Sequence, residues 1–163
     1  MPASLITIHE PMKTFLPVIS FLVTLVAPIP ALAIDPGTAE GSLLTNATTY
    51  KLAHAYAYQD SKELRIVLVD RELPKTVPNN LGFLSVAQVA REDKVRGLAI
   101  HMNPNDRRQT VVTVLHPTVV NRSSGVVQNF VIANNRVSGE LESRAPDAAY
   151  RVKFSAPLFT GKP

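Results

Sequence analysis

The chain has 163 residues, a formal net charge of +4 and no cysteine. This length suits a single domain, and the missing cysteines exclude disulfides, thiol catalysis and a lipid anchor on a processed cysteine. The positive charge is modest, and no motif of interleaved basic and aromatic residues accompanies it. We therefore expect no nucleic-acid partner.

The first 33 residues have the pattern of a secretory signal peptide. Lys13 supplies a positive start, Phe15–Ala27 is almost wholly apolar, and Ala31-Leu32-Ala33 places small residues at the cleavage site. Residues 1–11 contain no Lys or Arg, so translation from Met12 is the alternative start. Cleavage after Ala33 predicts a bacterial protein of the periplasm or the medium, with no membrane span in the mature chain. A membrane anchor is the competing interpretation.

Residues 34–40 are expected to be a mobile lead-in, and residues 41–163 a single domain. Thr49–Gln59 alternates with a period of two, which indicates a strand packed on both faces. Its bulky side chains fall on one side: Tyr50, Leu52, His54, Tyr56 and Tyr58. Asn46-Ala47-Thr48 is typical of a turn, so residues 42–58 are predicted to form a hairpin, and the β-branched run Leu64–Asp70 a central strand.

The sequence predicts one helix, over residues 85–95. Ser85 and Gln88 fit a capping box, in which each side chain bonds the other residue's backbone amide. Lys94 and Arg96 favour the negative C-terminal end, and Gly97 can end the helix. We expect the alanine side of the 49–59 strand to offer a flat surface for this helix.

From Gly97 onward the pattern is strand after strand. The expected strands are Gly97–Asn103, Thr110–His116, Val126–Ala133, Arg136–Arg144 and Tyr150–Ala156, with a two-residue turn at Asn134-Asn135. The fold class that follows is mainly β: a two-sheet antiparallel sandwich of about eight strands with one short helix. A small closed β-barrel with a helix is the alternative.

Several strand motifs carry a resemblance to a group of proteins. Tyr50-x-Leu52-x-His54-Ala-Tyr56-Ala, Leu68-Val-Asp70, Val137-Ser-Gly-Glu-Leu141 and Val152-Lys-Phe-Ser-Ala-Pro157 together resemble a loose group of uncharacterised secreted bacterial β-rich proteins. The resemblance covers roughly residues 41–159 and implies a small β domain behind a signal peptide. It assigns no functional residue.

A search for catalytic motifs finds none. Gly-x-Ser-x-Gly, Ser-x-x-Lys, a His-Glu-x-x-His pair and glycine-rich phosphate loops are all missing from the sequence. Three strand histidines, His54, His101 and His116, are the weak candidates for a metal site, but they lack the close spacing of strong zinc motifs. We expect no metal and no cofactor, and the sequence leans against an enzyme without excluding a triad that forms only in three dimensions.

Two sets of side chains are candidates for binding. His54, Tyr56 and Tyr58 can line a cleft, since tyrosine combines an apolar ring with a polar tip, although such a row is also typical of a core. Arg151 and Lys153 point outward on the last strand and can attract an anionic envelope polymer. The sequence therefore predicts an exported cell-envelope module that binds such a polymer or another exported protein, or has a structural role. A periplasmic metal-binding protein and a secreted inhibitor are the alternatives.

Overall fold

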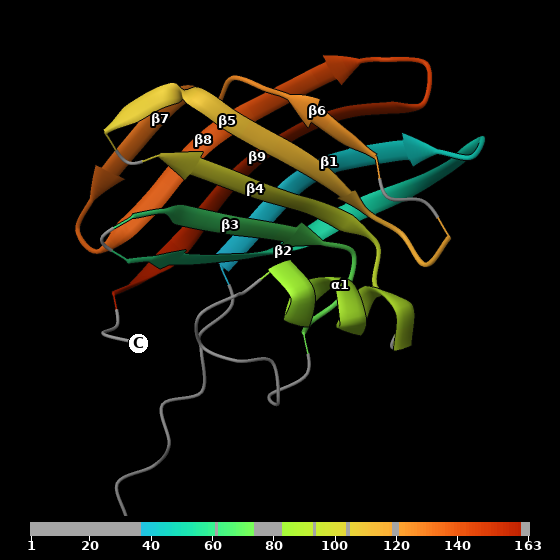
Figure 1. Cartoon of the computed structure of the whole chain (residues 1–163), viewed down its shortest axis with the longest axis horizontal. Helices are drawn as coiled ribbons and strands as arrows, with labels where there is room; N and C mark the ends of the chain where they lie inside the picture. The colour runs from blue at the N-terminus through green and yellow to red at the C-terminus, as the bar shows by residue number, and fades with distance from the viewer. Residues whose placement is uncertain are drawn as a thin grey trace, which may run out of the picture. The chain divides into compact units, whose positions relative to one another are not determined.

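The computed structural model describes residues 37–60, 62–73, 83–92, 94–103, 105–118 and 121–160, all of which belong to the unit Leu32–Pro163. The predicted signal peptide and residues 34–36 lie outside the described residues. The elements are β1 (Gly37–Thr45), β2 (Thr48–Gln59), β3 (Leu64–Val69), α1 (Phe83–Glu92), β4 (Gly97–Asn103), β5 (Asp106–Leu115), β6 (Arg122–Ser124), β7 (Gln128–Ala133), β8 (Arg136–Arg144) and β9 (Ala148–Thr160). The prediction of a mainly β protein with one short helix is confirmed (Figure 1).

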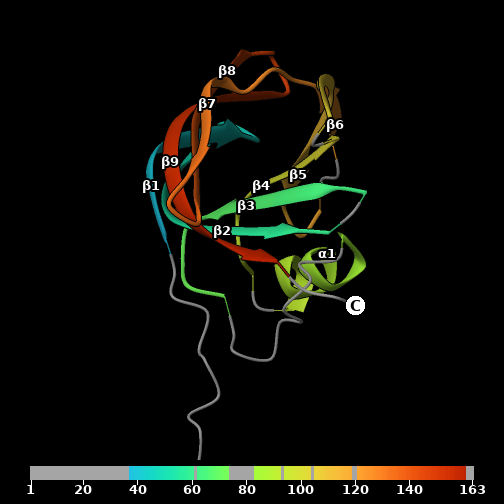
Figure 2. The same ribbon diagram turned by 90° about the vertical axis from the view of Figure 1, so that its left-hand side faces the viewer.

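All nine described strands belong to one sheet, in the order β6-β5-β4-β3-β2-β1-β9-β8-β7. Neighbouring strands run antiparallel, except that the ends of β2 and β9 also meet in a short parallel pairing. Because β1 pairs with both β2 and β9, one ladder joins the two halves of the sheet, and the predicted division into two sheets is not confirmed. The sheet curls so that its halves face each other (Figure 2).

The predicted alternative, a closed barrel, is wrong for the described strands. The strand order is that of a meander whose ends would meet only if β6 paired with β7, and these two strands are instead the two edges of the sheet. β6 has just three residues, all exposed, so it offers too short a ladder for closure. The chain crosses this opening through Gly125–Val127, where Val127 is buried in the core.

The main core lies between the facing halves of the sheet. Leu52, Leu68 and Ile100 from one half and Leu141 and Phe154 from the other belong to a single hydrophobic cluster. The alternation predicted for the last strand is confirmed, because Tyr150, Val152 and Phe154 are buried while Arg151 and Lys153 are exposed. Burial of large side chains from both halves is the main force that holds the curled sheet together.

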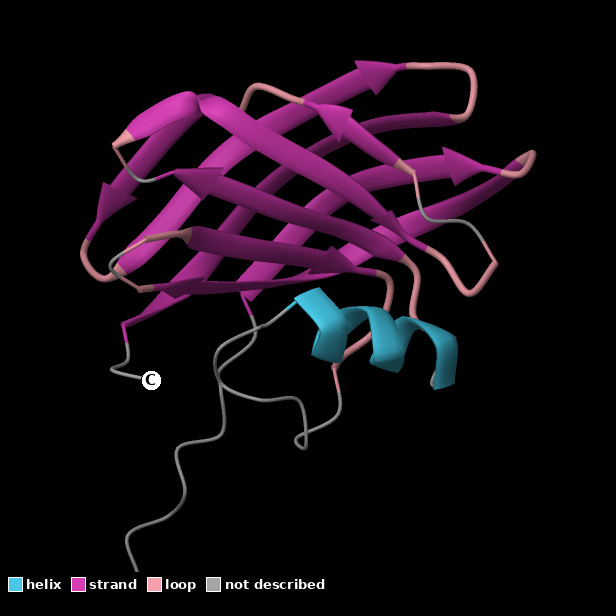
Figure 3. Ribbon diagram, in the orientation of Figure 1, coloured by secondary structure: helices cyan, strands magenta, loops and turns pink. Residues whose placement is uncertain are grey.

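The helix α1 covers the opposite face of β2, β3 and β4 (Figure 3). Val86 and Ala90 of the helix share a second cluster with Tyr56, Tyr58 and Val69. The expectation that the helix packs on the alanine side of this strand is therefore wrong: Ala55 and Ala57 belong to the main core. The helix also begins at Phe83 and ends at Glu92, so Ser85 is not the residue that precedes it.

The side-chain alternation of β2 changes part-way along the strand. Leu52 lies in the main core together with Ala55 and Ala57, although it is an odd number of residues from both. The pairing of β1 with β2 is irregular at this place, between Thr38 and Gly41. Such an irregularity shifts the side chains that follow to the other face of the sheet. The single aromatic face predicted for residues 50–58 is accordingly split between two clusters.

The two predicted asparagine turns are confirmed. Asn46 and Ala47 have φ of 50° and 58°, and Asn134 and Asn135 have φ of 51° and 56°. Positive φ at both central residues is the geometry of the tight turn that matches the twist of a hairpin.

Residues 37–40 do not form the lead-in expected over residues 34–40, because they are part of β1 and Ala39 is buried in the main core. Across the described residues, no helix combines the length and the apolar character that a membrane span requires.

Candidate functional site

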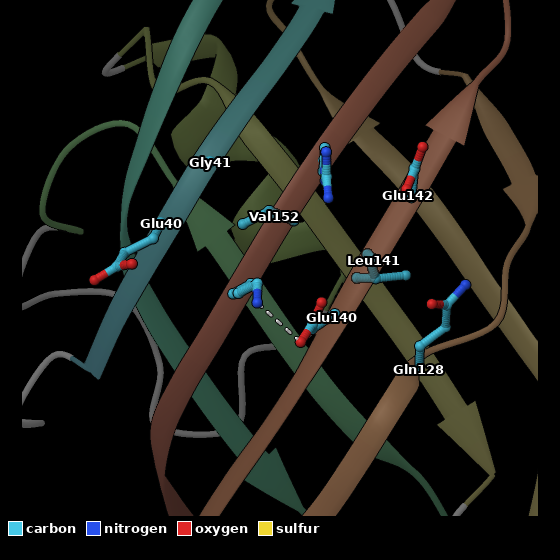
Figure 4. A pocket seen from close by; sticks show the side chains of 9 residues that line it. Glu40, Gly41, Gln128, Glu140, Leu141, Glu142 and Val152 are labelled. Carbon is cyan, nitrogen blue, oxygen red and sulfur yellow. Dashed lines mark ion pairs between the residues drawn. The ribbon is translucent and has the colours of Figure 1, made fainter.

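A groove of about 390 Å³ runs across β1, β9, β8 and β7 on the solvent-exposed face of the sheet (Figure 4). Figure 4 shows Glu140 near its middle, with Glu40 of β1 on one side and Gln128 of β7 on the other. The lining residues are Glu40, Gly41, Gln128, Glu140, Leu141, Glu142, Arg151, Val152 and Lys153. Two residues that the sequence singled out for binding, Arg151 and Lys153, are among them.

The strand register explains why these charges meet. Lys153 of β9 is opposite Glu40 on β1 and opposite Glu140 on β8. Two residues away, Arg151 lies between Ser42 and Glu142 in the same manner. Residues directly opposite one another on neighbouring strands are close enough to interact. The floor of the groove therefore carries one cross-strand row of alternating charge, Glu40–Lys153–Glu140, and one oppositely charged cross-strand pair, Arg151 and Glu142.

In the row of alternating charge, Lys153 and Glu140 are paired with each other. The Lys153 Nζ lies 3.2 Å from Glu140 Oε1, and Asn129 Nδ2 donates to the same oxygen over 3.3 Å. The hydrogen bond from Lys153, followed by the one from Asn129, lowers the pKa of Glu140 below its ordinary value. Glu140 is thus a carboxylate at neutral pH and does not suit the role of a general acid, which needs a raised pKa.

Two charged residues of the groove are not used by these contacts: Glu40, at the end of the Lys153 row, and Arg151, in the cross-strand pair with Glu142. Glu142 accepts from Arg144 Nη2 at 2.9 Å and from Arg144 Nε at 3.0 Å, so it is not engaged with Arg151 across the ladder. Within the described residues, Arg151 and Glu40 make no hydrogen bond or ion pair through their side chains. Among the described residues, the hydrogen-bond donors of Arg151 and the carboxylate of Glu40 are thus available to a ligand, although the charge of Arg151 contributes to lowering the pKa of Glu140.

The lining residues are mainly charged and include no Ser, Thr, Tyr, His or Cys. They also include no aromatic ring on which a sugar could stack. Contacts to a ligand would be charge-assisted hydrogen bonds, which a planar guanidinium makes best with carboxylate or phosphate groups.

Tyr56 and Tyr58, the other predicted binding residues, do not lie in this groove. Both are buried beneath α1, in the second hydrophobic cluster. The Tyr56 hydroxyl accepts a hydrogen bond from the Leu73 backbone N–H at 3.1 Å, and burial is the main cause of its raised pKa. His54 is half-buried on β2, opposite Thr38 and Val69. Their environment is that of a core and its margin.

The structure does not gather the three histidines. His101 Nδ1 lies 2.8 Å from Glu63 Oε1, whereas His116 contacts Thr118 through its own Nδ1 at the far end of β5. In the ranges that the structure describes, no group of three or more His, Cys, Asp or Glu residues could hold a metal ion. No histidine-based metal centre is therefore found in the described part of the chain.

The sequence reasoning missed a second polar depression, of about 550 Å³, which lies beyond α1 on β3, β4 and β5. Arg65 sits at its centre, 2.6 Å from Glu63 Oε2 and 3.1 Å from Asp60 Oδ2, with its guanidinium 5.7 Å from the centroid of the Tyr58 ring. The spacing of Asp60, Glu63 and Arg65 across the β2–β3 loop is the signal that could have predicted this network. Within this network the charges of Asp60, Glu63 and Arg65 compensate one another, while Lys62 and Arg108 also line the depression.

A third polar cluster lies where α1 leads into β4. The Arg96 guanidinium is 5.7 Å from the centroid of the Tyr50 ring, whose centroid is 6.1 Å from that of His116. Arg96 also joins β3 to β4, because its N–H donates to Asp70 Oδ1 at 2.9 Å while its carbonyl accepts from the Asp70 N–H at 2.9 Å. Burial, and then the charge of Arg96, lower the pKa of His116. We assign this cluster a role in holding the end of the sheet.

Comparison with protein-family models, with curated proteins and with solved structures finds no match to this chain.

Proposed function

We propose that this protein is an exported cell-envelope binding module that holds an anionic, hydroxyl-rich polymer in the groove across β1, β9, β8 and β7. The observation that carries the proposal is the free guanidinium of Arg151 in a groove whose neighbouring cation, Lys153, is already paired with Glu140. The supporting scaffold is sandwich-like, with the halves of the curled sheet acting as two layers.

The chemistry of the groove selects the ligand class. Arg151 suits a carboxylate or phosphate, because its donors match two acceptor oxygens at once. Three lining carboxylates, Glu40, Glu140 and Glu142, suit hydroxyl donors and repel a ligand that is anionic at every position. A polymer with spaced acidic groups and free hydroxyls, such as a uronic-acid polysaccharide, fits both requirements.

Export supports this class of ligand. The signal-peptide pattern of residues 1–33 favours export, and an exported protein meets envelope polymers, which carry sugar hydroxyls and acidic groups. The groove is shallow and lacks aromatic rings, so each site should bind weakly, with a Kd on the order of 0.1–1 mM. A polymer that presents many copies of its acidic group offers many such sites along its length.

The test is calorimetric titration with polygalacturonate, with neutral dextran as the uncharged control polymer. Arg151→Gln should weaken binding about tenfold, because it removes a charge-assisted hydrogen bond of about 1.5 kcal/mol. Arg91→Gln is the matched control: it removes the same charge from an exposed position on α1, outside the groove, and should change Kd by less than about twofold. Equal weakening by both variants, or no binding of polygalacturonate, would refute the proposal.

A further inference from the structure

The edge strand β7 is unusual among the described strands for its exposed apolar side chains. Val131 and Ile132 are 51% and 46% exposed, and Val126, just before the strand, is 68% exposed. β7 pairs with β8 alone and ends the sheet on that side (Figures 1 and 2). Unpaired edges of this kind are templates for a further strand, and proteins that must stay separate protect them with charged residues.

No charge protects this edge. Residues 123–135 contain no Asp, Glu, Lys or Arg, although the whole chain carries a formal charge of +4. Two copies can therefore meet at β7 without placing like charges together. The polar groups of this stretch are mainly amides, Gln128, Asn129, Asn134 and Asn135. An amide is both donor and acceptor, so it is complementary to a second copy of itself.

The backbone geometry defines how a second copy would pair. The two-residue turn at Asn134-Asn135 makes Ala133 and Arg136 a pair that exchanges both of its backbone hydrogen bonds. Because such pairs alternate along an antiparallel ladder, the N–H and C=O of Ile132 point away from β8, toward the open edge. A strand placed there antiparallel, with its own Ile132 opposite, would exchange two hydrogen bonds with it.

A bulge limits the length of this contact. The β7–β8 register shifts between Gln128 and Val131, and Asn129 has φ of 50°. The regular part of the edge is therefore Val131–Ala133, which is short. A single short strand pair buries less surface than a permanent interface, so association should be weak and reversible.

From these observations we propose that β7 is a homodimerisation edge, at which a second copy of the chain adds its own β7 antiparallel. The two-fold axis would pass between the two Ile132 residues. A two-fold axis normal to the sheet keeps the outer faces of both copies on the same side. The grooves that reach β7 through Gln128 would then lie on one continuous surface. Dimerisation itself does not depend on the ligand proposed above.

The test is sedimentation equilibrium of the wild-type protein from about 10 μM to about 500 μM, a range that spans weak association. We expect a monomer–dimer equilibrium. Ile132→Lys should raise the dimer dissociation constant at least about tenfold, since the introduced lysines would face each other across the axis. Leu44→Lys is the matched control, because Leu44 is 43% exposed and lies on β1, so it should leave the dimer unchanged.

A monomer at every concentration would overturn the proposal, and so would an equal response to the two lysine variants. Circular dichroism establishes that both variants are folded. If Ile132→Lys does not fold, spin labels on a single cysteine decide the matter, since the natural chain has none. The two Val131 residues would be offset by two positions on neighbouring strands, with their Cα atoms about 8 Å apart, so Val131→Cys should give a short distance between labels and Leu44→Cys should not. The absence of a short distance for Val131→Cys refutes the dimer.

Discussion

The buried hydrogen bond between Tyr56 and Leu73 gives a stability prediction that separates core from binding roles. Tyr56→Phe removes one oxygen atom and leaves the ring beneath α1 in place. The Leu73 N–H, which donates to that oxygen at 3.1 Å, would lose its acceptor in a buried environment, because Leu73 is 7% exposed and Tyr56 is 4% exposed. A buried donor without a partner costs about 1–3 kcal/mol.

The assay is urea unfolding at neutral pH, with Tyr50→Phe as the control. Tyr50 is half-buried, and its contacts with Arg96 and His116 involve the ring, which phenylalanine keeps. We expect Tyr56→Phe to lower the free energy of unfolding by about 1–3 kcal/mol and Tyr50→Phe by less than about 0.5 kcal/mol. The same loss corresponds to a fall in melting temperature on the order of 4 °C per kcal/mol.

The pH dependence provides an independent check. The pKa of Tyr56 is raised, mainly by burial, so the unfolded chain releases this proton at a lower pH than the folded protein does. The stability that protonated Tyr56 contributes is complete below the ordinary tyrosine pKa of about 10, and it is lost as the pH rises through the pKa of Tyr56 in the folded protein. Tyr56→Phe should therefore lose less stability than Tyr50→Phe between neutral pH and about pH 11. Equal free energies of unfolding for the two variants at neutral pH would refute the reasoning. An equal loss of stability in both variants between neutral pH and about pH 11 would also refute it.

Two further predictions concern the ends of the central strands. Gly97→Ala should lower the free energy of unfolding in urea by about 3 kcal/mol or more. The added Cβ would lie 1.9 Å from the Leu68 carbonyl oxygen and 2.9 Å from Val69 Cα, and both are backbone atoms. A loss of less than about 1 kcal/mol would contradict this prediction. Burial and the charge of Arg96 lower the pKa of His116. The stability that neutral His116 contributes is therefore complete above the ordinary histidine pKa of about 6.5, and it is lost as the pH falls through the pKa of His116 in the folded protein. Arg96→Gln should move this pKa part of the way back up in an NMR titration, since burial remains, and an unchanged pKa would show that the charge of Arg96 does not reach the imidazole.

The outward charges of β9 could be predicted because a strand places alternate residues on opposite faces whatever surrounds it. Arg151 and Lys153 were placed correctly on that ground, although Glu40 was not seen as their neighbour. Its position depends on the register of β1 against β9, strands that are separated by most of the chain. The groove could not be predicted from local patterns because its rows run across strands rather than along them.

Local signals thus predicted the described strands except β6, the presence of the helix and the two asparagine turns, since each depends on backbone preferences and on periodicity within a few residues. The tertiary structure alone decided that the helix lies on the tyrosine side of β2, and that the described strands form one curled sheet because β1 pairs with both β2 and β9. It also decided that Arg151 makes no side-chain hydrogen bond or ion pair among the described residues. An irregular pairing near Thr38 moves side chains to the other face, and the choice between neighbouring charges depends on distances that only the packed sheet establishes.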